Sequence, residues 1–239
     1  MSSSILITGT AGKLGTAIAK LLPNAIAATR MDFDITNAIE IEKYLDAHIG
    51  IDTIVHCAAM ISPPKIKENP VEATHANIIG TALLANACYK RNIRLVYIST
   101  DYVFSGDKGN YDEASELLPQ NKYAWSKLGG ECAVQMLDKF VIIRLSFGPD
   151  EFPYKAAFVD QFTSRESASA IAIKIKNIAL SEYNGIIHIG GSRKSVFDYA
   201  LSLGANDIDK ISIKDMSVKM PVDTSLDCSL YNSLFQNNN

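Results

Sequence analysis

The sequence has few cysteines, and no two of them stand at a spacing typical of metal or redox sites. Its four cysteines, Cys57, Cys88, Cys132 and Cys228, lie far apart and form no C-x-x-C motif. Isolated thiols of this kind are usual in a reducing compartment, where disulfides are rare. We therefore expect free, mostly structural thiols, no metal site and a cytoplasmic protein.

Long hydrophobic runs and runs of basic residues are missing as well. No apolar stretch is long enough to span a bilayer, and the N-terminus opens with a strand-like segment without the pattern of a secretion signal. Lys and Arg number 23 against 26 Asp and Glu, which gives a net charge of −3. Nucleic acid and membranes are therefore not expected as partners. A small anionic ligand stays open, since it needs only a few local donors.

The remaining composition is that of a globular protein, with 47% hydrophobic and 21% charged residues in 239 positions. Short apolar runs alternate with helical patterns, which predicts an α/β fold with a doubly wound parallel sheet. Strands are predicted over residues 4–8, 25–29, 53–56, 95–99, 140–145 and 186–189. Helices are predicted over residues 12–22, 37–49, 70–91, 123–137, 167–181 and 195–203, the last with Ser195 as its N-cap.

The domain prediction follows from this alternation. Residues 1–148 read as a dinucleotide-binding domain of the Rossmann type, with residues 186–203 contributing to it. Beyond residue 148 the pattern loosens. Residues 149–239 are predicted to form a small C-terminal substrate-binding portion that is not an independent domain.

A glycine-rich loop follows the first strand directly. Gly9, Gly12 and Gly15 have the spacing G-x-x-G-x-x-G and open a helix. One glycine allows a sharp turn, one lets the backbone approach a pyrophosphate, and one lets helix and strand pack closely. Because the helix N-terminus offers free N–H groups to phosphates, we expect a dinucleotide here, with Thr10, Lys13 and Leu14 also in contact. A simple glycine-rich turn is the alternative.

Two charged residues address the choice of cofactor: Arg30, which ends the second predicted strand, and Asp34, which follows it. Arg30 lies where an adenosine ribose would bind, and a guanidinium there can hold a 2′-phosphate. This favours NADP(H), while NAD stays possible. Asp34 is a candidate acceptor for the adenine amino group. A solvated arginine and a helix-capping turn are the alternatives for these two residues.

Tyr123 and Lys127 form a Y-x-x-x-K motif at the start of a predicted helix. A spacing of four places both side chains on one helical face. An adjacent ammonium favours the phenolate and would lower the pKa of the tyrosine, so that it can transfer a proton at neutral pH. The pair alone also fits an exposed helix surface.

Thr100 stands at the carboxyl end of the fourth predicted strand, in the segment 97–104. Ligands of open α/β sheets bind at such strand ends, so Thr100 is placed to donate a hydrogen bond to a substrate carbonyl. Glycine loop, strand end and Y-x-x-x-K motif, in this order, favour an NAD(P)-dependent oxidoreductase.

With these motifs the sequence resembles the extended short-chain dehydrogenases/reductases, most closely the dTDP-4-dehydrorhamnose reductase group. Further motifs carry the resemblance: residues 56–59 (HCAA), 77–81 (NIIGT), 98–104 (ISTDYVF), 119–127 (PQNKYAWSK), 144–146 (RLS), 160–161 (DQ), 185–188 (GIIH) and 225–227 (SLD).

The resemblance implies that Tyr123 donates the proton, that Thr100 contacts the carbonyl, and that Lys127 tunes Tyr123 and binds the nicotinamide ribose. The further cofactor contacts expected are Ile35, Cys57, Ala58, Ala59, Asn77 and Ser99. The substrate contacts expected are Asp101, Tyr102, Ser146, Phe147, Arg165 and Arg193.

The resemblance also implies a substrate class, a keto sugar linked to a nucleotide. Related 4,6-dehydratases carry Thr-Asp-Glu where this chain has Thr100, Asp101 and Tyr102, so carbonyl reduction is favoured over elimination. Residues 148–160 are shorter than the usual substrate region, and Met220 replaces a common arginine. Two other hypotheses stay open: a non-catalytic NADP-binding subunit like the β-subunit of methionine adenosyltransferase, and a reductase or epimerase of another carbonyl compound. A homodimer through helices 70–91 and 123–137 is possible.

Overall fold

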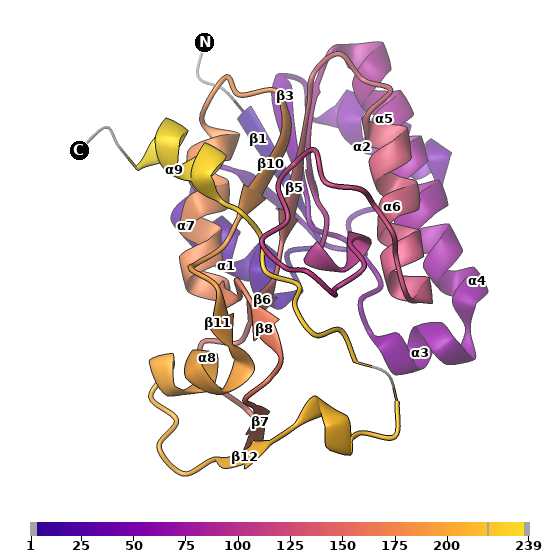
Figure 1. Ribbon diagram of the computed structural model, residues 1–239. Helices are drawn as coiled ribbons and strands as arrows, with labels where there is room; N and C mark the ends of the chain where they lie inside the picture. Colours follow the sequence, from indigo (N-terminus) through magenta and orange to yellow (C-terminus); the bar gives the residue numbers. More distant parts are fainter. Residues whose placement is uncertain (1–3, 219, 237–239) are drawn as a thin grey trace.

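A parallel sheet of six strands forms the centre of the computed structural model, which describes residues 4–218 and 220–236. Its order is β10-β5-β4-β3-β1-β2, and every neighbouring pair is parallel (Figure 1). The strands are β1 (Ser4–Thr8), β2 (Ile26–Ala28), β3 (Ile51–His56), β4 (Arg94–Ile98), β5 (Phe140–Leu145) and β10 (Gly185–Ile189). The predicted fold class is confirmed.

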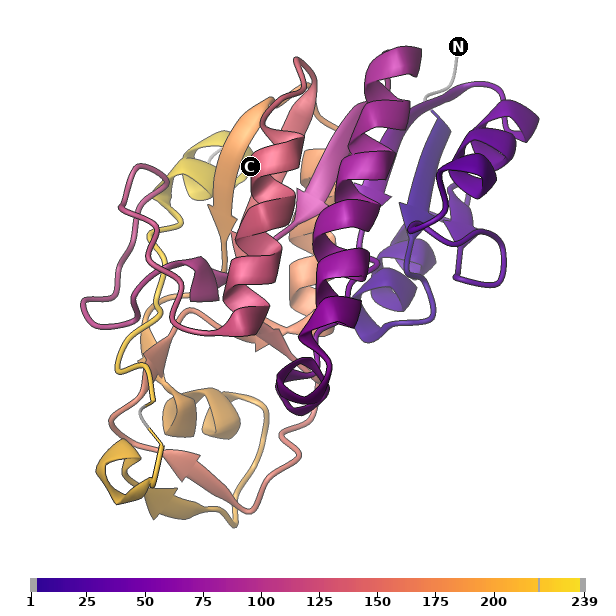
Figure 2. The same ribbon diagram turned by 90° about the vertical axis from the view of Figure 1, so that its right-hand side faces the viewer.

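Helices cover both faces of this sheet (Figures 1 and 2). One layer holds α1 (Lys13–Leu21) and α7 (Ala168–Ala179), and the other holds α2 (Ala38–Ala47), α5 (Gly80–Arg91) and α6 (Lys122–Val134). Each layer closes its own apolar core against the sheet, because the strands present Ile, Leu and Val on both sides. No helix within the described residues is long and apolar enough to cross a membrane.

The helix predicted over residues 70–91 is continuous in the chain but not uniform. It consists of α4 (Pro70–Ala73), a π-helical segment (Thr74–Ile79) and α5. Such π segments widen the turn locally and recur at functional sites. Here the segment carries Asn77, whose buried side-chain amide bonds both the N–H and the carbonyl of Met60, at 2.7 and 2.9 Å.

The winding of the sheet reverses between β1 and β3. From β1 the chain continues to β2 on one side, and it returns to β3 on the other side. The loops after these two strands therefore separate and leave a crevice, which is where open α/β sheets bind ligands. Strand β2 already ends at Ala28, so that Arg30 lies in the following turn and not at the strand end.

A small lower part is built from short pieces that the sequence did not predict. Strand β6 (Phe147–Gly148) pairs with β9 (Glu166–Ser167), β7 (Ala156–Phe158) with β12 (Asp209–Ile211), and β8 (Phe162–Thr163) with β11 (Lys194–Ser195). Strands of two or three residues are too short to show an alternating pattern. Four further short elements were not predicted: helices α3 (Pro63–Glu68) and α9 (Ser229–Phe235) and the 3-10 turns Asp101–Val103 and Ile213–Asp215. Helix α8 (Val196–Ser202) was predicted, and Ser195 caps it by accepting from Asp198 N at 2.9 Å.

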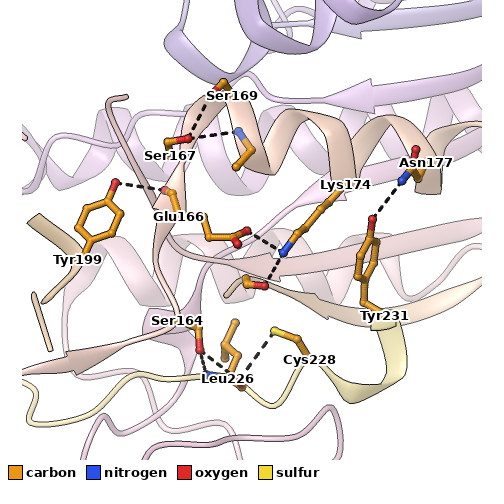
Figure 3. A network of polar contacts seen from close by, with 12 residues as sticks. Ser164, Glu166, Ser167, Ser169, Lys174, Asn177, Tyr199, Leu226, Cys228 and Tyr231 are labelled. Carbon is orange, nitrogen blue, oxygen red and sulfur yellow. Dashed lines mark hydrogen bonds and ion pairs between the residues drawn. The ribbon is translucent and has the colours of Figure 1, made fainter. Parts of the chain in front are cut away.

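Polar contacts around α7 connect the segment that contains Leu226 and Tyr231 to the rest of the structure (Figure 3). The ammonium of Lys174 donates to the Gly190 carbonyl at 2.5 Å and pairs with Glu166 at 2.7 Å. Ser164 and Leu226 exchange two hydrogen bonds, one in each direction. Residues beyond 148 thus supply strand β10 of the central sheet and helix α7, which packs on α1.

All four cysteines are free, as predicted. Burial raises the pKa of the thiols of Cys57, Cys88 and Cys228 to about 12, so these three are inert structural groups. Cys132 differs, because its side chain is exposed on α6.

Candidate active site

A cavity of about 730 Å³ opens at the carboxyl ends of β1, β3 and β4. This is the crevice at the reversal of the sheet. Its volume lies in the range of small-molecule and cofactor sites. The predicted site residues that line it are Gly9, Gly12, Lys13, Leu14, Gly15, Arg30, Asp34, Ile35, Cys57, Ala58, Ala59, Ser99, Tyr123, Lys127 and Phe147.

The glycine loop forms a tight cradle on one wall of the cavity. Gly9 has φ +72°, and a Cβ there would lie 2.6 Å from the backbone nitrogen of Ala58. A Cβ at Gly15 would lie 2.4 Å from the Gly9 carbonyl oxygen. Both positions thus require glycine. Gly12 precedes α1 without a side-chain cap, which leaves the first N–H groups of the helix free for an anion. The residues present fit a dinucleotide pyrophosphate.

Arg30 and Asp34 lie at the far end of the cavity and bind each other. The guanidinium donates from Nε and Nη2 to one Asp34 oxygen, at 3.1 and 2.9 Å, while 77% of the Arg30 side chain is exposed. The other oxygen accepts from Thr36 N and Oγ1. Although burial opposes it, the hydrogen bonds from Thr36 and Arg30 hold the pKa of Asp34 below its usual value. Asp34 thus makes a turn with Thr36 just before α2, whose cap is Asn37, and it lines the cavity.

Tyr123 stands in the first turn of α6, which Asn121 caps by accepting from Ala124 N at 2.9 Å. Burial, and then the nearby Asp101, raise the pKa of Tyr123 above its ordinary value, while a hydrogen bond with Thr100 opposes the shift. This differs from the expectation that Lys127 would lower that pKa. The reason is that removal of the phenol from water, the largest contribution, disfavours the phenolate, and the nearby Asp101 adds to it. Tyr123 therefore keeps its proton.

Lys127 lies one turn further along α6 and is 3% exposed. Its ammonium nitrogen lies 4.1 Å from the centre of the Tyr97 ring. Burial lowers the pKa of Lys127 to about 7, and Glu131 opposes this shift. At neutral pH the charge of this lysine is thus decided by its surroundings.

Four of the predicted substrate residues come together beside Tyr123. Asp101 is buried, and its pKa is raised by burial, although Thr224, Thr100 and Ser146 bond it and Arg165 lies near. Arg165 donates from Nε to Ser146 Oγ at 3.3 Å and hydrogen-bonds Tyr102. One oxygen of Asp101 has no hydrogen-bond partner within the described residues. The group combines a carboxyl, hydroxyls and a guanidinium, as recognition of a hydroxyl-rich ligand requires.

Three predicted residues have other contacts. Arg193 donates to Asp223 at 2.6 Å, stacks on the Phe162 ring at 3.7 Å and lines a second cavity of about 430 Å³. Thr10 donates to the Ala28 carbonyl at 3.0 Å and so ties the glycine loop to β2. Asn77 is fully buried and supports the cavity wall through Met60.

The cavity also contains residues that the sequence did not indicate. They come from the turn after β2 and from the segment between β3 and α5: Thr29, Phe33, Thr36, Met60, Ile61, Asn69, Val71, Glu72, His75 and Ala76. These residues belong to no short motif, and only the folded chain brings them to the glycine loop. The pair Glu131 and Arg144 was missed too, although the distance of four between Lys127 and Glu131 on a helix was a usable signal.

A parallel sheet with a glycine cradle at its reversal point, together with Tyr123 and Lys127 on one helix face, defines a short-chain dehydrogenase/reductase. Comparison with known proteins gives the family. Residues 3–177 match the model of the family described as RmlD substrate binding domain. The chain belongs to this family, and the predicted resemblance is confirmed.

Individual relatives agree with this family. The chain is 37% identical over 154 residues to dTDP-4-keto-6-deoxy-D-glucose reductase of Streptomyces niveus, an alignment that covers 62% of this chain and 53% of the relative. The chain spans about half the length of the curated relatives it matches.

Solved structures match over nearly the whole chain. The structure of a dTDP-4-dehydrorhamnose reductase from Clostridium acetobutylicum has a TM-score of 0.86 at 26% identity, over 98% of this chain and 92% of that one. A dTDP-4-dehydrorhamnose reductase of Bacillus anthracis, solved in complex with NADP, has a TM-score of 0.86 at 24% identity, with coverage of 98% and 92%. Most of the chain beyond residue 148 thus has a counterpart in these solved structures, although residues 148–160 were predicted to be shorter than the usual substrate region.

Proposed function

We propose that the protein binds NADPH in the main cavity and reduces the keto group of a sugar, with a nucleotide-linked 4-keto-6-deoxy sugar as the favoured substrate. The relatives from Streptomyces niveus and Clostridium acetobutylicum, both named as reductases of such sugars, support this substrate class. The Bacillus anthracis structure with NADP supports the cofactor.

The observation that carries the proposal is a neutral tyrosine between the glycine-cradle cavity and the polar group around Asp101. Tyr123 lines the cavity, hydrogen-bonds Thr100 and has a raised pKa. A phenol that keeps its proton suits a general acid for carbonyl reduction.

When bound, NADPH supplies a hydride to the keto carbon. The Tyr123 hydroxyl donates its proton to the carbonyl oxygen, so that C=O becomes CH–OH and a phenolate remains on the protein. Thr100 orients the Tyr123 hydroxyl. Lys127 binds the ribose and stabilises the phenolate, which requires that the lysine be protonated.

The polar group beside Tyr123 would hold the sugar. Asp101 offers its unpartnered oxygen, and Tyr102, Ser146 and Arg165 offer donors to hydroxyl or phosphate groups. The position after Asp101 holds tyrosine, which lacks the carboxylate base needed to eliminate water. Residues 149–239 would thus supply the substrate-binding portion, with Arg165 as its anionic-group ligand.

The test is oxidation of NADPH, followed at its absorbance band, with a panel of dTDP-, UDP-, GDP- and CDP-linked 4-keto-6-deoxy sugars. Turnover with one of them, and its loss in Tyr123→Phe, would support the proposal. The matched control is Tyr89→Phe, because the Tyr89 side chain is exposed on α5 and does not line the cavity.

Binding without turnover would favour the non-catalytic alternative. A melting experiment separates the cases, because a ligand at about 100 times its dissociation constant stabilises by about 2.7 kcal/mol. If NADPH raised the melting temperature and no nucleotide sugar raised it further, the substrate assignment would fail. Loss of the sugar-dependent shift in Arg165→Ala would support the assignment of Arg165.

A further inference from the structure

A buried ion pair lies directly beneath the lysine of the site and has no part in the reaction described above. Glu131 follows Lys127 by one turn on α6 and is 0% exposed. Arg144, from β5, is 1% exposed and donates to the Glu131 carboxylate from Nε, at 3.2 Å to both oxygens, and from Nη2 at 2.8 Å. Ser99, which lines the cavity, also donates to Glu131.

The burial of this pair needs a reason. Taking two charges out of water costs several kcal/mol per ion, and a buried pair is often no more stabilising than apolar residues of the same volume. Stability alone is thus a weak reason for its presence. Its position is a stronger one, because Glu131 bonds the arginine and follows Lys127 by four residues on α6, a spacing that places both side chains on one face of the helix.

The other groups that face Lys127 supply no negative charge at neutral pH. From β3 and the residue after it come His56, whose pKa burial lowers to about 3, and Cys57, whose pKa burial raises to about 12. From β4 comes Tyr97, whose pKa burial raises well above the ordinary value. From α6 itself comes Tyr123, which keeps its proton. Among the groups that act on Lys127, only Glu131 thus carries a negative charge.

We propose that Glu131, held in place by Arg144, is the positioning residue that keeps Lys127 protonated in the site. The catalytic use of this charge rests on the proposed function, since the lysine must stabilise the Tyr123 phenolate. The control of the Lys127 charge by Glu131 does not rest on the proposed function.

Lys127 and Arg144 both act on Glu131, one from the preceding turn of α6 and the other by direct contact from β5, and this arrangement predicts opposite effects of two substitutions. Glu131→Gln removes the counter-charge and leaves two cations, so the pKa of Lys127 falls. Arg144→Met removes the competing cation, so the pKa of Lys127 rises. An opposite charge at close range typically shifts a pKa by about 1–3 units, and we expect about one unit or more in each direction.

The experiment measures Lys127 directly by NMR titration of protein labelled with ¹⁵N at the lysine side chains, without cofactor, with Lys127→Arg for assignment. A titration midpoint at least one pH unit lower in Glu131→Gln, and a higher one in Arg144→Met, is the expected result. Arg144→Lys, which keeps the charge, should restore most of the wild-type midpoint. An unchanged midpoint in Glu131→Gln, or shifts of the same sign in both variants, would overturn the proposal.

Two further variants keep the test decisive. Glu42→Gln is the matched control, because Glu42 also accepts from two cations, Lys90 and Arg91, on the surface between α2 and α5. The titration midpoint of Lys127 in the Glu42→Gln variant should equal that in the wild type. If a single variant does not fold, the double variant Glu131→Gln with Arg144→Met replaces both charges by neutral groups, and it should still lower the midpoint.

The kinetic readout separates this proposal from the proposed function. With a reducible keto sugar, the acidic side of the pH profile of kcat should be the same in Glu131→Gln and in the wild type. On the alkaline side, kcat of Glu131→Gln should begin to fall at a lower pH than kcat of the wild type, because Lys127 loses its charge earlier. A shifted NMR midpoint in a protein that reduces none of the sugars would leave the charge control intact and refute the proposed function alone.

Discussion

The pairing of Arg30 with Asp34 makes a quantitative prediction about the preference for NADPH over NADH. Arg30 lines the adenosine end of the cavity, is 77% exposed and is already bound to Asp34. To hold a 2′-phosphate, the guanidinium must loosen this pair. The perturbation is Arg30→Ala, together with Asp34→Asn, which removes the competing charge and keeps an acceptor for Thr36.

The magnitude follows from two opposing contributions. A hydrogen bond to a charged group contributes about 1.5–3 kcal/mol, and an exposed ion pair about 0.2–1 kcal/mol. The net loss of NADPH binding in Arg30→Ala is then about 0.5–2.8 kcal/mol, which is roughly 2- to 110-fold in the dissociation constant. Asp34→Asn frees the guanidinium and should strengthen NADPH binding by about 0.2–1 kcal/mol.

The assay is a titration of NADPH and NADH into the wild type and both variants at one fixed, low ionic strength, because salt screens exposed charges. Binding of NADH should change by less than about 0.5 kcal/mol in Arg30→Ala, as for an ordinary surface substitution. Equal losses for the two cofactors would refute the reasoning and place the 2′-phosphate elsewhere. Stronger NADPH binding in Arg30→Ala would refute it too.

Three further predictions concern catalysis, stability and reactivity. Tyr123→Phe should lower kcat by about 10²–10⁴ and leave NADPH affinity within a few-fold; steady-state kinetics with a reducible sugar decide it, and wild-type turnover would exclude Tyr123 as the acid. Ser195→Ala should destabilise the protein by about 0.5–2 kcal/mol, since the hydroxyl caps α8; denaturant unfolding measures this, and an unchanged midpoint would contradict the capping role. A thiol reagent at pH 8 should label Cys132 rapidly and Cys88 slowly, since burial raises the pKa of Cys88 to about 12; equal rates, read by mass spectrometry, would contradict the burial.

Much of the fold was predictable because its long elements repeat a pattern. The six strands of the sheet carry runs of Ile, Leu and Val, and the helices between them carry a periodic apolar face, so that local sequence alone indicates them. The cradle was predictable for a related reason. At Gly9 and Gly15 a side chain would collide with backbone, and glycine is the one residue that avoids this.

The chemistry of the site was less accessible to the sequence. The spacing of Tyr123 and Lys127 predicted their common face, but the direction of the tyrosine pKa depends on burial and on Asp101, which comes from another element. Arg165 and Arg193 looked alike as candidate anion ligands. In the folded chain Arg165 joins Ser146 and Tyr102, whereas Arg193 is taken by Asp223.

The sequence by itself thus determined the class of fold, the glycine cradle and the common helix face of Tyr123 and Lys127, because these depend on short-range spacing and on the absence of a side chain. Tertiary structure alone decided which charges meet. Glu131 and Arg144 are 13 residues apart in the chain and come from a helix and a strand, and their contact exists because α6 packs on the sheet. Burial then lowers the pKa of Lys127 and raises that of Tyr123, since the free energy of a charge depends on everything that surrounds it and not only on its neighbours in sequence.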